Sequence, residues 1–472
     1  MPRAIDPQIS FADLEFSRQG VRLDPTLQRI SDFLGDHAEL VERVRQDLER
    51  GLKNPHTGRS GLTASQVLRS FVLRRVKNWD YRELRERIAD GYTLRQFTDF
   101  CSQPVPQHDA FHRAFNRLTP RTLQALNESV VQAAVALGLE DGKQLRVDTT
   151  VVETHIHRPT DSTLLWDTVR FLTRLVGHLD EELPQGVQGF TIRTRSARRR
   201  MQEIQRLTPK ERHEQQVPKY RQLIRTTEQV VQNARQVLAQ TQDAKGLDPV
   251  QSALIRALRK DIEHYCQLGD RVISQARRRV LEGEQVPSQE KIYSIFETHT
   301  DLIKRGKAEK PVEFGHKVFL AESAQGLITQ YRLLDGNPSD EDHVEPSLQR
   351  HQKMFGRAPE LYGSDRGFHN QRNQEACQQA GVRLPCIPQR GGKKTPERET
   401  YEKSPAFKKA QRFRAGIEGR ISVLFRGRGM KRCLLKGRER FELLVGAAVL
   451  ANNLLRIADL LTKKQPRQRL VA

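Results

Sequence analysis

The sequence predicts a mixed α/β core that is interrupted by a large all-helical insertion and preceded by an all-α domain. Helix caps and apolar periodicity agree repeatedly between residues 62 and 138, and β-branched residues cluster at 145–152. Helical periodicity from about 164 to 285 then separates this cluster from later strand signals. The expected divisions are an N-terminal arm (1–61), a helical domain (62–140), a core (141–163 and 286–462), an insertion (164–285) and a basic tail (463–472).

The first helical domain shows clear helix starts. Thr63 and Gln66 form a capping box, Asp80 begins a second helix that Gly91 is expected to end in the left-handed conformation, and the Thr-Pro pair at 119–120 begins a longer one. Short basic helices joined by tight turns suit a helix-turn-helix DNA reader. Small helical domains without a DNA partner have the same pattern, so this interpretation stays open.

The strand at 145–152 is followed at once by the insertion. Thr-Pro at 208–209 and Asp-Pro at 248–249 are helix starts, and apolar residues three and four apart follow each of them. We therefore expect an antiparallel helical hairpin. The arginine run at 193–200 either contacts phosphate or lies on a solvated helix face.

After the insertion, strand and helix signals alternate. Residues 313–322 and 327–334 are expected to form a β-hairpin, and two further short strands are expected at 360–365 and 382–387. The polar, Pro/Gly-containing stretch at 391–409 is interpreted as a mobile linker. The remaining helices are expected near 344–354, 371–380, 411 and 439–461.

Composition favours a soluble protein with a polyanionic partner. The 472 residues carry 80 Lys and Arg against 58 Asp and Glu, a formal charge of +22, and nucleic acid is the leading candidate partner. The five cysteines form no C-x-x-C pair, which fits a reducing cytoplasm and gives no sign of a zinc site. We expect no membrane span and no signal peptide. The expected location is the bacterial cytoplasm, at the nucleoid.

Three carboxylates stand where chemistry could take place. Asp148 lies within a strand among apolar neighbours, where an ionised side chain is costly unless it is paired or bound to a metal. Asp365 follows the end of another strand, and Glu418 lies one helical turn after Arg414. The same patterns would arise if Asp148 faced solvent from its strand, if Asp365 were an ordinary turn residue, and if Arg414 and Glu418 formed a surface ion pair. Two-metal phosphodiester cleavage needs oxygen ligands, which Asp and Glu supply.

The blocks around these carboxylates resemble those of DDE transposases from bacterial insertion sequences, most closely the ISNCY family. Residues 147–154 (VDTTVVET) look like the first catalytic block and residues 364–368 (SDRGF) like the second. Arg414 and Glu418 match the arginine-three-residues-glutamate core of the third. Residues 62–118 are similar to the N-terminal helical domain of these transposases, so the resemblance spans nearly the whole chain in the family's order.

The resemblance implies a ribonuclease-H-like core in which Asp148, Asp365 and Glu418 are catalytic and bind two Mg²⁺ or Mn²⁺ ions. It implies binding of terminal inverted repeats by the N-terminal helices, hydrolytic release of a 3′-hydroxyl at the element end, and attack of that hydroxyl on target DNA. It also implies a homo-oligomer that holds two double-stranded DNA ends in a synaptic complex. No P-loop is present, and no nucleotide cofactor is expected.

The resemblance also indicates DNA contacts. It implies that Arg414 helps to place the DNA strand. The chain has Gln411 where the family often has a tyrosine, and Phe425 where the family has a lysine. The residues predicted to contact DNA are Arg366, Arg414, Arg426, Arg428 and Lys431, with Arg426 preferred as the replacement for the lysine.

Other interpretations remain. A regulator derived from a transposase would bind DNA without cutting it, a structure-specific nuclease on the same core would cut without joining, and a glycosidase would explain neither the charge nor the basic helices. His155 and His157, with Glu153 nearby, could together bind a transition metal, an interpretation that we give less weight than the carboxylate site. Further acids that could orient the metal ligands through hydrogen bonds are Asp161, Asp301, Asp335 and Asp342.

Overall fold

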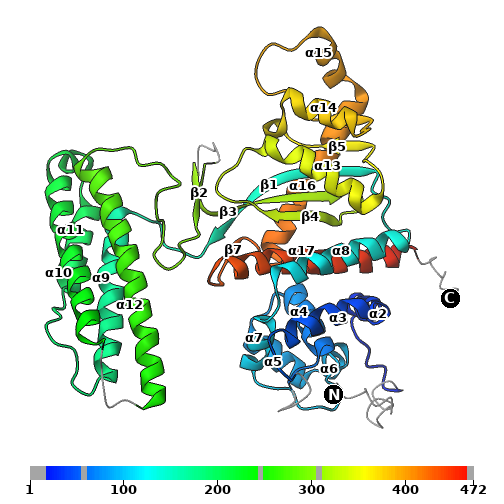
Figure 1. Ribbon diagram of the computed structural model, residues 1–472. Helices are drawn as coiled ribbons and strands as arrows, with labels where there is room; N and C mark the ends of the chain where they lie inside the picture. The colour runs from blue at the N-terminus through cyan, green and yellow to red at the C-terminus, as the bar shows by residue number, and fades with distance from the viewer. Residues whose placement is uncertain (1–17, 55–60, 243–247, 305–310, 465–472) are drawn as a thin grey trace. The chain divides into compact units, whose positions relative to one another are not determined.

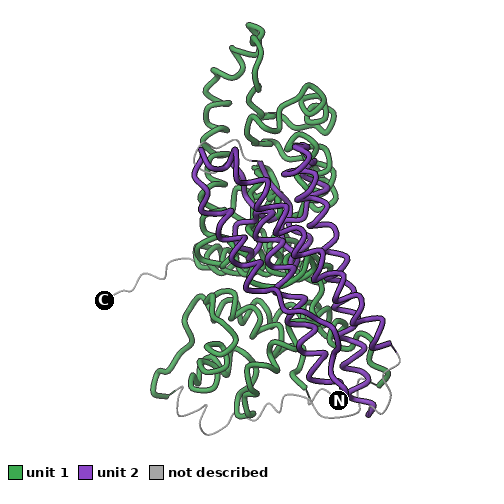
Figure 2. The backbone as a smooth tube through the Cα atoms, turned by 90° about the vertical axis from the view of Figure 1, so that its left-hand side faces the viewer, with its two compact units in different colours: residues 1–153, 316–472 green, residues 154–315 purple. Residues whose placement is uncertain are grey.

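The computed structural model describes residues 18–54, 61–242, 248–304 and 311–464. The chain divides into two compact units, which Figure 2 colours green and purple. Unit 1 comprises Met1–Glu153 and His316–Ala472, and unit 2 comprises Thr154–Gly315. Unit 2 contains the whole stretch expected as a helical insertion and extends beyond it at both ends. Parts of the expected N-terminal arm and most of the expected basic tail lie outside the described residues.

The N-terminal part of unit 1 is helical, as the sequence predicts. Thr63 and Gln66 form the expected capping box, with N–H to side-chain distances of 3.0 and 3.1 Å. The left-handed ending expected at Gly91 is wrong: its φ is −98°, because the next helix begins directly after it and needs extended backbone. The helices are α2 (Pro25–Asp36), α3 (Ala38–Glu49), α4 (Ala64–Lys77), α5 (Tyr81–Asp90), α6 (Tyr92–Phe97), α7 (His108–Phe115) and α8 (Pro120–Ala136).

Two of these helices lie in the segment expected to be an arm. The apolar faces of α2 and α3, including Leu27, Ile30 and Val44, are buried in the same core as α4 and α8. Asp24 caps α2 by accepting the N–H groups of Thr26 and Leu27. The described part of this segment is therefore an integral piece of unit 1.

A mixed sheet forms the centre of unit 1 (Figure 1). Its strands follow the order β4-β3-β1-β5-β6, and β7 also pairs with β1. The expected β3–β4 hairpin is antiparallel, whereas β1–β5 and β5–β6 are parallel. The strands are β1 (Gln144–Thr154), β3 (Val312–Ser323), β4 (Ile328–Leu333), β5 (Leu361–Gly363), β6 (Leu384–Cys386) and β7 (Arg432–Cys433).

Helices follow the later strands in alternation. They are α13 (Val344–Phe355), α14 (Gln371–Gln379), α15 (Pro396–Lys403), α16 (Pro405–Gly427) and α17 (Arg438–Lys464), with short 3-10 turns η2 (Asp340–His343) and η3 (Arg366–Phe368). The mobile linker expected at 391–409 is wrong, because α15 and the start of α16 occupy most of it. Thr395 and Ser404 each cap a helix with proline at its first position, the same signal that marks α8.

The long helix α17 forms part of the core of unit 1 and packs along α8 (Figure 1). By length and composition alone, α17 is long and apolar enough to cross a membrane. However, 78% of the most apolar 18-residue stretch of this helix is buried inside the protein. Phe441, Val445 and Val449 are fully buried. This burial is typical of the core helix of a soluble protein.

Unit 2 is a bundle of four helices, α9 (Asp161–Glu182), α10 (Thr194–Arg206), α11 (Pro209–Gln240) and α12 (Pro249–Ala276), followed by a π-helical turn, η1 (Arg277–Leu281). The expected hairpin is present as α11 and α12, but α9 and α10 complete the bundle. The apolar face of α9, including Leu164, Leu172 and Leu179, closes the core. A short strand, β2 (Asp301–Lys304), pairs with Val312–Gly315 at the start of β3.

Candidate active site

Asp148 lies in the middle of β1, in unit 1. Its strand neighbour Val147 is fully buried, and the side chain of Asp148 itself is only 14% exposed. Its Oδ1 accepts the backbone N–H of Thr149 at 2.8 Å, and its Oδ2 accepts Arg414 Nη2 at 2.9 Å. The carboxylate is therefore half-buried and paired with a cation.

Asp365 comes beside Asp148 because of strand register. In the parallel β1–β5 pair, Arg146 lies opposite Gly363, and each aspartate follows its pairing residue by two positions. Asp365 lies two residues beyond the end of β5 and caps η3, where its Oδ1 accepts the N–H of Gly367 at 2.8 Å. The sequence located both aspartates at strands, but only the register makes them neighbours.

Arg414, on α16, joins the carboxylates. Its Nη2 lies 2.9 Å from Asp148 Oδ2 and 3.6 Å from Asp365 Oδ2, and its Nη1 lies 3.5 Å from Glu418 Oε1. The helix can approach the sheet this closely because Gly363 has no side chain: a Cβ there would lie 3.3 Å from Arg414 Cβ. Arg414 Nε is buried and, among the described residues, has no hydrogen-bond partner.

Glu418 occupies the rim of this arrangement. Its side chain is 71% exposed, in contrast to that of Asp148, and it reaches the other carboxylates only through Arg414. The spacing of four residues between Arg414 and Glu418 places both on one helix face, as the sequence indicates.

A fourth carboxylate, Asp340, joins the group, and the sequence analysis did not consider it. Its Oδ1 accepts Thr149 Oγ at 2.7 Å and Lys317 Nζ at 2.8 Å. A Cβ built on Gly367 would lie 2.9 Å from Asp340 Oδ2 and 3.0 Å from Asp365 Oδ1, so the two carboxylates flank this glycine. We call Asp148, Asp340, Asp365 and Glu418 the acidic cluster. In the sequence, Asp340 lies in an acidic run after a strand and has the pattern of an ordinary turn residue.

The four acids expected to orient the metal ligands either lie in unit 2 or face solvent. Asp335 is 89% exposed and paired with Arg438, and Asp342 is exposed. Asp161 is buried in unit 2, where it accepts hydrogen bonds from Gln275 and Arg279, and Asp301 is on β2. None of these four acids belongs to the acidic cluster, whereas Asp340, which was not among them, does.

Burial changes the protonation of Asp148. Its pKa is raised from the ordinary 3.8 to about 6, chiefly because burial penalises the charged form. The guanidinium of Arg414 acts in the opposite direction, and the negative charges of Asp365 and Asp340 raise the pKa further. The four carboxylates of the acidic cluster thus exceed the two cations paired with them, Arg414 and Lys317.

The donor set of the acidic cluster fits a hard divalent cation, since carboxylate oxygens are the ligands that Mg²⁺ and Mn²⁺ prefer. Within residues 18–54, 61–242, 248–304 and 311–464, no three His, Cys, Asp or Glu side chains are grouped so that they could hold a metal as they stand. The guanidinium of Arg414 contacts both aspartates and is the positive charge that now joins them.

The residues predicted to contact DNA differ in their surroundings. Arg366, Arg426 and Lys431 are exposed. Arg428 donates to the backbone oxygens of Val76 (2.7 Å) and Gly427 (2.9 Å), so it ties the end of α16 to α4. The histidine pair at 155 and 157 lies outside this site in unit 2, where His157 Nε2 is 3.4 Å from Asp167.

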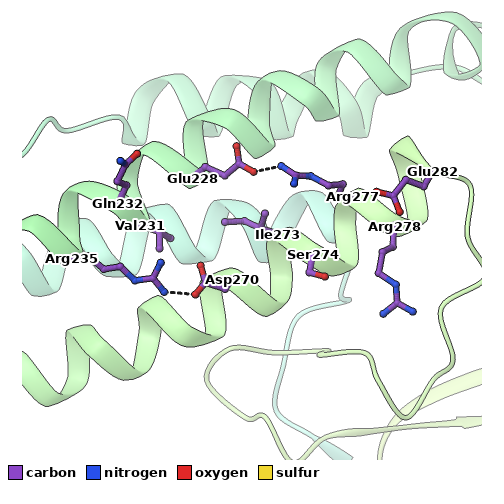
Figure 3. A pocket seen from close by; sticks show the side chains of 10 residues that line it. All are labelled: Glu228, Val231, Gln232, Arg235, Asp270, Ile273, Ser274, Arg277, Arg278 and Glu282. Atoms are coloured by element: carbon purple, nitrogen blue, oxygen red, sulfur yellow. Dashed lines mark hydrogen bonds and ion pairs between the residues drawn. The ribbon is translucent and has the colours of Figure 1, made fainter.

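A second candidate site is a hollow in unit 2 between α11 and α12 (Figure 3). Val231 and Ile273 form its apolar floor. Four of its charged side chains pair with one another, Arg235 with Asp270 and Arg277 with Glu228, and the other two, Arg278 and Glu282, are of opposite sign. We call this hollow the charged groove. Its paired charges offer no excess of one sign for a ligand, so the acidic cluster is the better candidate for chemistry.

Comparisons with known proteins leave the family open. No protein-family model, curated protein or solved structure is significantly similar to this chain. The functional assignment therefore rests on the residues and their geometry.

Proposed function

We propose that this protein is the DDE transposase of a bacterial insertion sequence. The observation that carries the proposal is the convergence of Asp148 and Asp365 on Arg414, whose helix bears Glu418 one turn later. These are the carboxylates and the arginine of the three resemblance blocks. Asp148 lies more than 200 residues before the other three in the sequence, and unit 2 separates it from them.

The sheet order supports a ribonuclease-H-like core. The first strand, β1, is central, with an antiparallel hairpin on one side and two parallel strands on the other. Parallel strands require crossover connections, which α13 and α14 supply before β5 and β6. A central strand and a neighbouring parallel strand can bring two carboxylates to one place, as two-metal chemistry requires.

The chain's residues have distinct roles in the proposed reaction. Asp148, Asp365 and Glu418 would hold the divalent ions, and Asp340 adds negative charge beside them. Arg414 holds the two aspartates together and is the proposed contact for the DNA strand. Two Mg²⁺ or Mn²⁺ ions, when bound, would supply activation of the attacking oxygen and stabilisation of the leaving oxygen. In the first step water attacks the phosphodiester at the element end, and the bond from phosphorus to the 3′-oxygen breaks to release a 3′-hydroxyl. In the second step this hydroxyl attacks a phosphodiester of the target DNA, whose own 3′-oxygen is the leaving group.

The proposed substrate is double-stranded DNA. The formal charge of +22 favours a polyanion, and exposed Arg366, Arg426 and Lys431 are the proposed phosphate contacts in unit 1. The helical segment α4–α8 is the proposed reader of the terminal inverted repeats. We propose a homo-oligomeric synaptic complex that acts at the nucleoid in the bacterial cytoplasm.

The decisive assay combines labelled DNA carrying the element's own ends, a target plasmid, and Mg²⁺ or Mn²⁺. The wild type is compared with Asp365→Ala, and with Asp342→Ala as a matched control on an exposed neighbouring acid. Cleavage and joining by the wild type and the control, but not by Asp365→Ala, support the transposase. Cleavage without joining indicates a structure-specific nuclease, and binding without cleavage indicates a regulator.

A further inference from the structure

A buried ion bridge lies beside the acidic cluster. Glu322, at the end of β3, has a fully buried side chain. Its Oε2 accepts Arg146 Nε at 2.8 Å, and its Oε1 accepts Arg420 Nε at 2.8 Å. Removing a carboxylate from water is costly unless it is fully paired, and here each oxygen has its own guanidinium. We call Arg146, Glu322 and Arg420 the Glu322 bridge.

The far ends of the two arginines reach other elements. Arg146 Nη1 donates to the backbone oxygen of Phe413 on α16 at 2.7 Å, and its guanidinium lies 4.9 Å from the centre of the Phe413 ring. Arg420 Nη1 donates to Asn452 Oδ1 on α17 at 3.0 Å. The bridge thus links β1, β3, α16 and α17 through directional hydrogen bonds.

The bridge begins and ends next to the residues of the acidic cluster. Arg146 precedes Asp148 by two positions on β1, so both side chains lie on the same face of the strand. Phe413, which accepts from Arg146, directly precedes Arg414 in the chain. A shift of α16 along the sheet would break these bonds and move Arg414 and Glu418 away from the aspartates.

Two glycines make room for the arginines. A Cβ on Gly416 would lie 2.9 Å from Arg146 Cζ, and a Cβ on Gly326, whose φ is +82°, would lie 3.5 Å from Arg420 Cζ. A free arginine head would move aside at small cost. The head of Arg146 cannot do so without losing Glu322 and the Phe413 oxygen.

We propose that the Glu322 bridge is a positioning device which fixes the place of α16 on the sheet and so assembles the acidic cluster with Arg414. The positioning residues in this proposal are Arg146, Glu322 and Arg420. Gly416 leaves the space that the guanidinium of Arg146 occupies. The consequence for DNA cleavage rests on the proposed function, whereas the consequence for the position of α16 does not.

The test uses two glycines of one helix. Gly416→Ala introduces a methyl group against Arg146, whereas Gly419→Ala, three residues later, meets nothing within 4 Å. Alanine favours a helix interior over glycine, so Gly419→Ala is expected to keep or raise the Tm. Gly416→Ala is expected to displace α16. In Gly416→Ala/Arg146→Gln the shorter side chain removes the clash and can still donate to Glu322, but it no longer reaches the Phe413 oxygen, so α16 is expected to return part of the way.

The position of α16 is measured directly. Spin labels on Lys143→Cys and Arg412→Cys, both exposed positions of unit 1, report the distance between β1 and α16 by pulsed EPR in a Cys101→Ser background. We expect a shifted or broadened distance for Gly416→Ala, the wild-type distance for Gly419→Ala, and an intermediate distance for the double variant. If Gly416→Ala does not fold, Glu322→Gln, which keeps the volume but removes the charge, is measured instead with the same expected shift.

Unchanged distances in the Gly416→Ala or Glu322→Gln variant would overturn the positioning device. DNA cleavage is measured on the same variants, and misplacement of Arg414 and Glu418 is expected to lower it roughly 100-fold, with partial recovery in the double variant. A distance shift in a protein whose wild type cleaves no DNA would support the positioning device and contradict the proposed function, so the two failures are distinguishable.

Discussion

The acidic cluster of unit 1 and the charged groove of unit 2 contain the same residue types with different consequences. In the groove each arginine has its own carboxylate, and the paired side chains of Arg235 and Asp270 are 46% and 48% exposed. In the cluster one guanidinium, 17% exposed, faces three carboxylates. In the groove the charges are balanced and exposed to water, so they do not favour an additional ion. In the cluster the excess negative charge lies in a largely buried site, so binding of a further cation is favoured.

The largest expected difference between the two regions is in catalysis. Asp148→Asn removes a proposed metal ligand and should lower DNA cleavage by roughly 10³-fold or more, since metal stabilisation of the transition state is worth several kcal/mol. Asp270→Asn in the charged groove removes the same charge and should leave cleavage unchanged. Single-turnover rates on end-containing DNA measure both. Equal loss in the two variants would contradict the assignment of the site.

The second expected difference is in stability against pH. Because the pKa of Asp148 is about 6 in the folded protein against an ordinary 3.8, the folded state binds this proton more tightly. The free energy of unfolding therefore falls as pH rises from about 4 to 6, by about 3 kcal/mol at 1.36 kcal/mol per pKa unit. Asp148→Asn should be more stable than the wild type at pH 8 by about this amount, and the gain should vanish near pH 4.

Denaturant unfolding without divalent ions, at pH 4 to 8, measures this effect. Asp342→Asn, which removes the charge of an exposed side chain, serves as the control and should show no such dependence. A gain for Asp148→Asn that is constant with pH would show that burial does not hold the proton on Asp148.

A third expected difference concerns the cations. Arg414→Gln removes the charge that lowers the pKa of Asp148, so that pKa should rise above 6. The free energy of unfolding at pH 8 should fall by roughly 2 kcal/mol, less than for a fully buried pair. Mn²⁺ should restore part of this loss if a metal cation replaces the guanidinium. Thermal unfolding with and without Mn²⁺ checks both points, and no response to Mn²⁺ would argue against a cation site there.

The smallest effect is expected in the charged groove. Arg277→Gln breaks the pair with Glu228, whose side chains are 50% and 38% exposed. Solvent screening limits such pairs to about 0–1 kcal/mol, and the loss should shrink further at high salt. Denaturant unfolding at low and high salt tests this. A loss as large as that of Arg414→Gln would show that the groove carries more than balanced surface charge.

Local signals in the sequence located most elements. Caps such as Thr63 with Gln66 and starts such as Thr119 followed by proline depend on neighbouring residues alone, and the structure confirms them. The same Thr-Pro and Ser-Pro signal was present at Thr395 and Ser404 but was outweighed by the polar composition around it. Polarity does not prevent helix formation when one face still packs, as Phe407 and Ala410 do on α16.

The sequence by itself determined the strands that carry Asp148 and Asp365 and the helix that carries Arg414 and Glu418, because period and capping are local properties. Tertiary structure decided which of these residues meet. The β1–β5 register set the two aspartates level, the Glu322 bridge fixed α16 across them, and Asp340 joined through Lys317 and Thr149. The Arg146–Glu322 and Thr149–Asp340 contacts join chain segments more than 150 residues apart, and their pairing energies exist only after the sheet has formed.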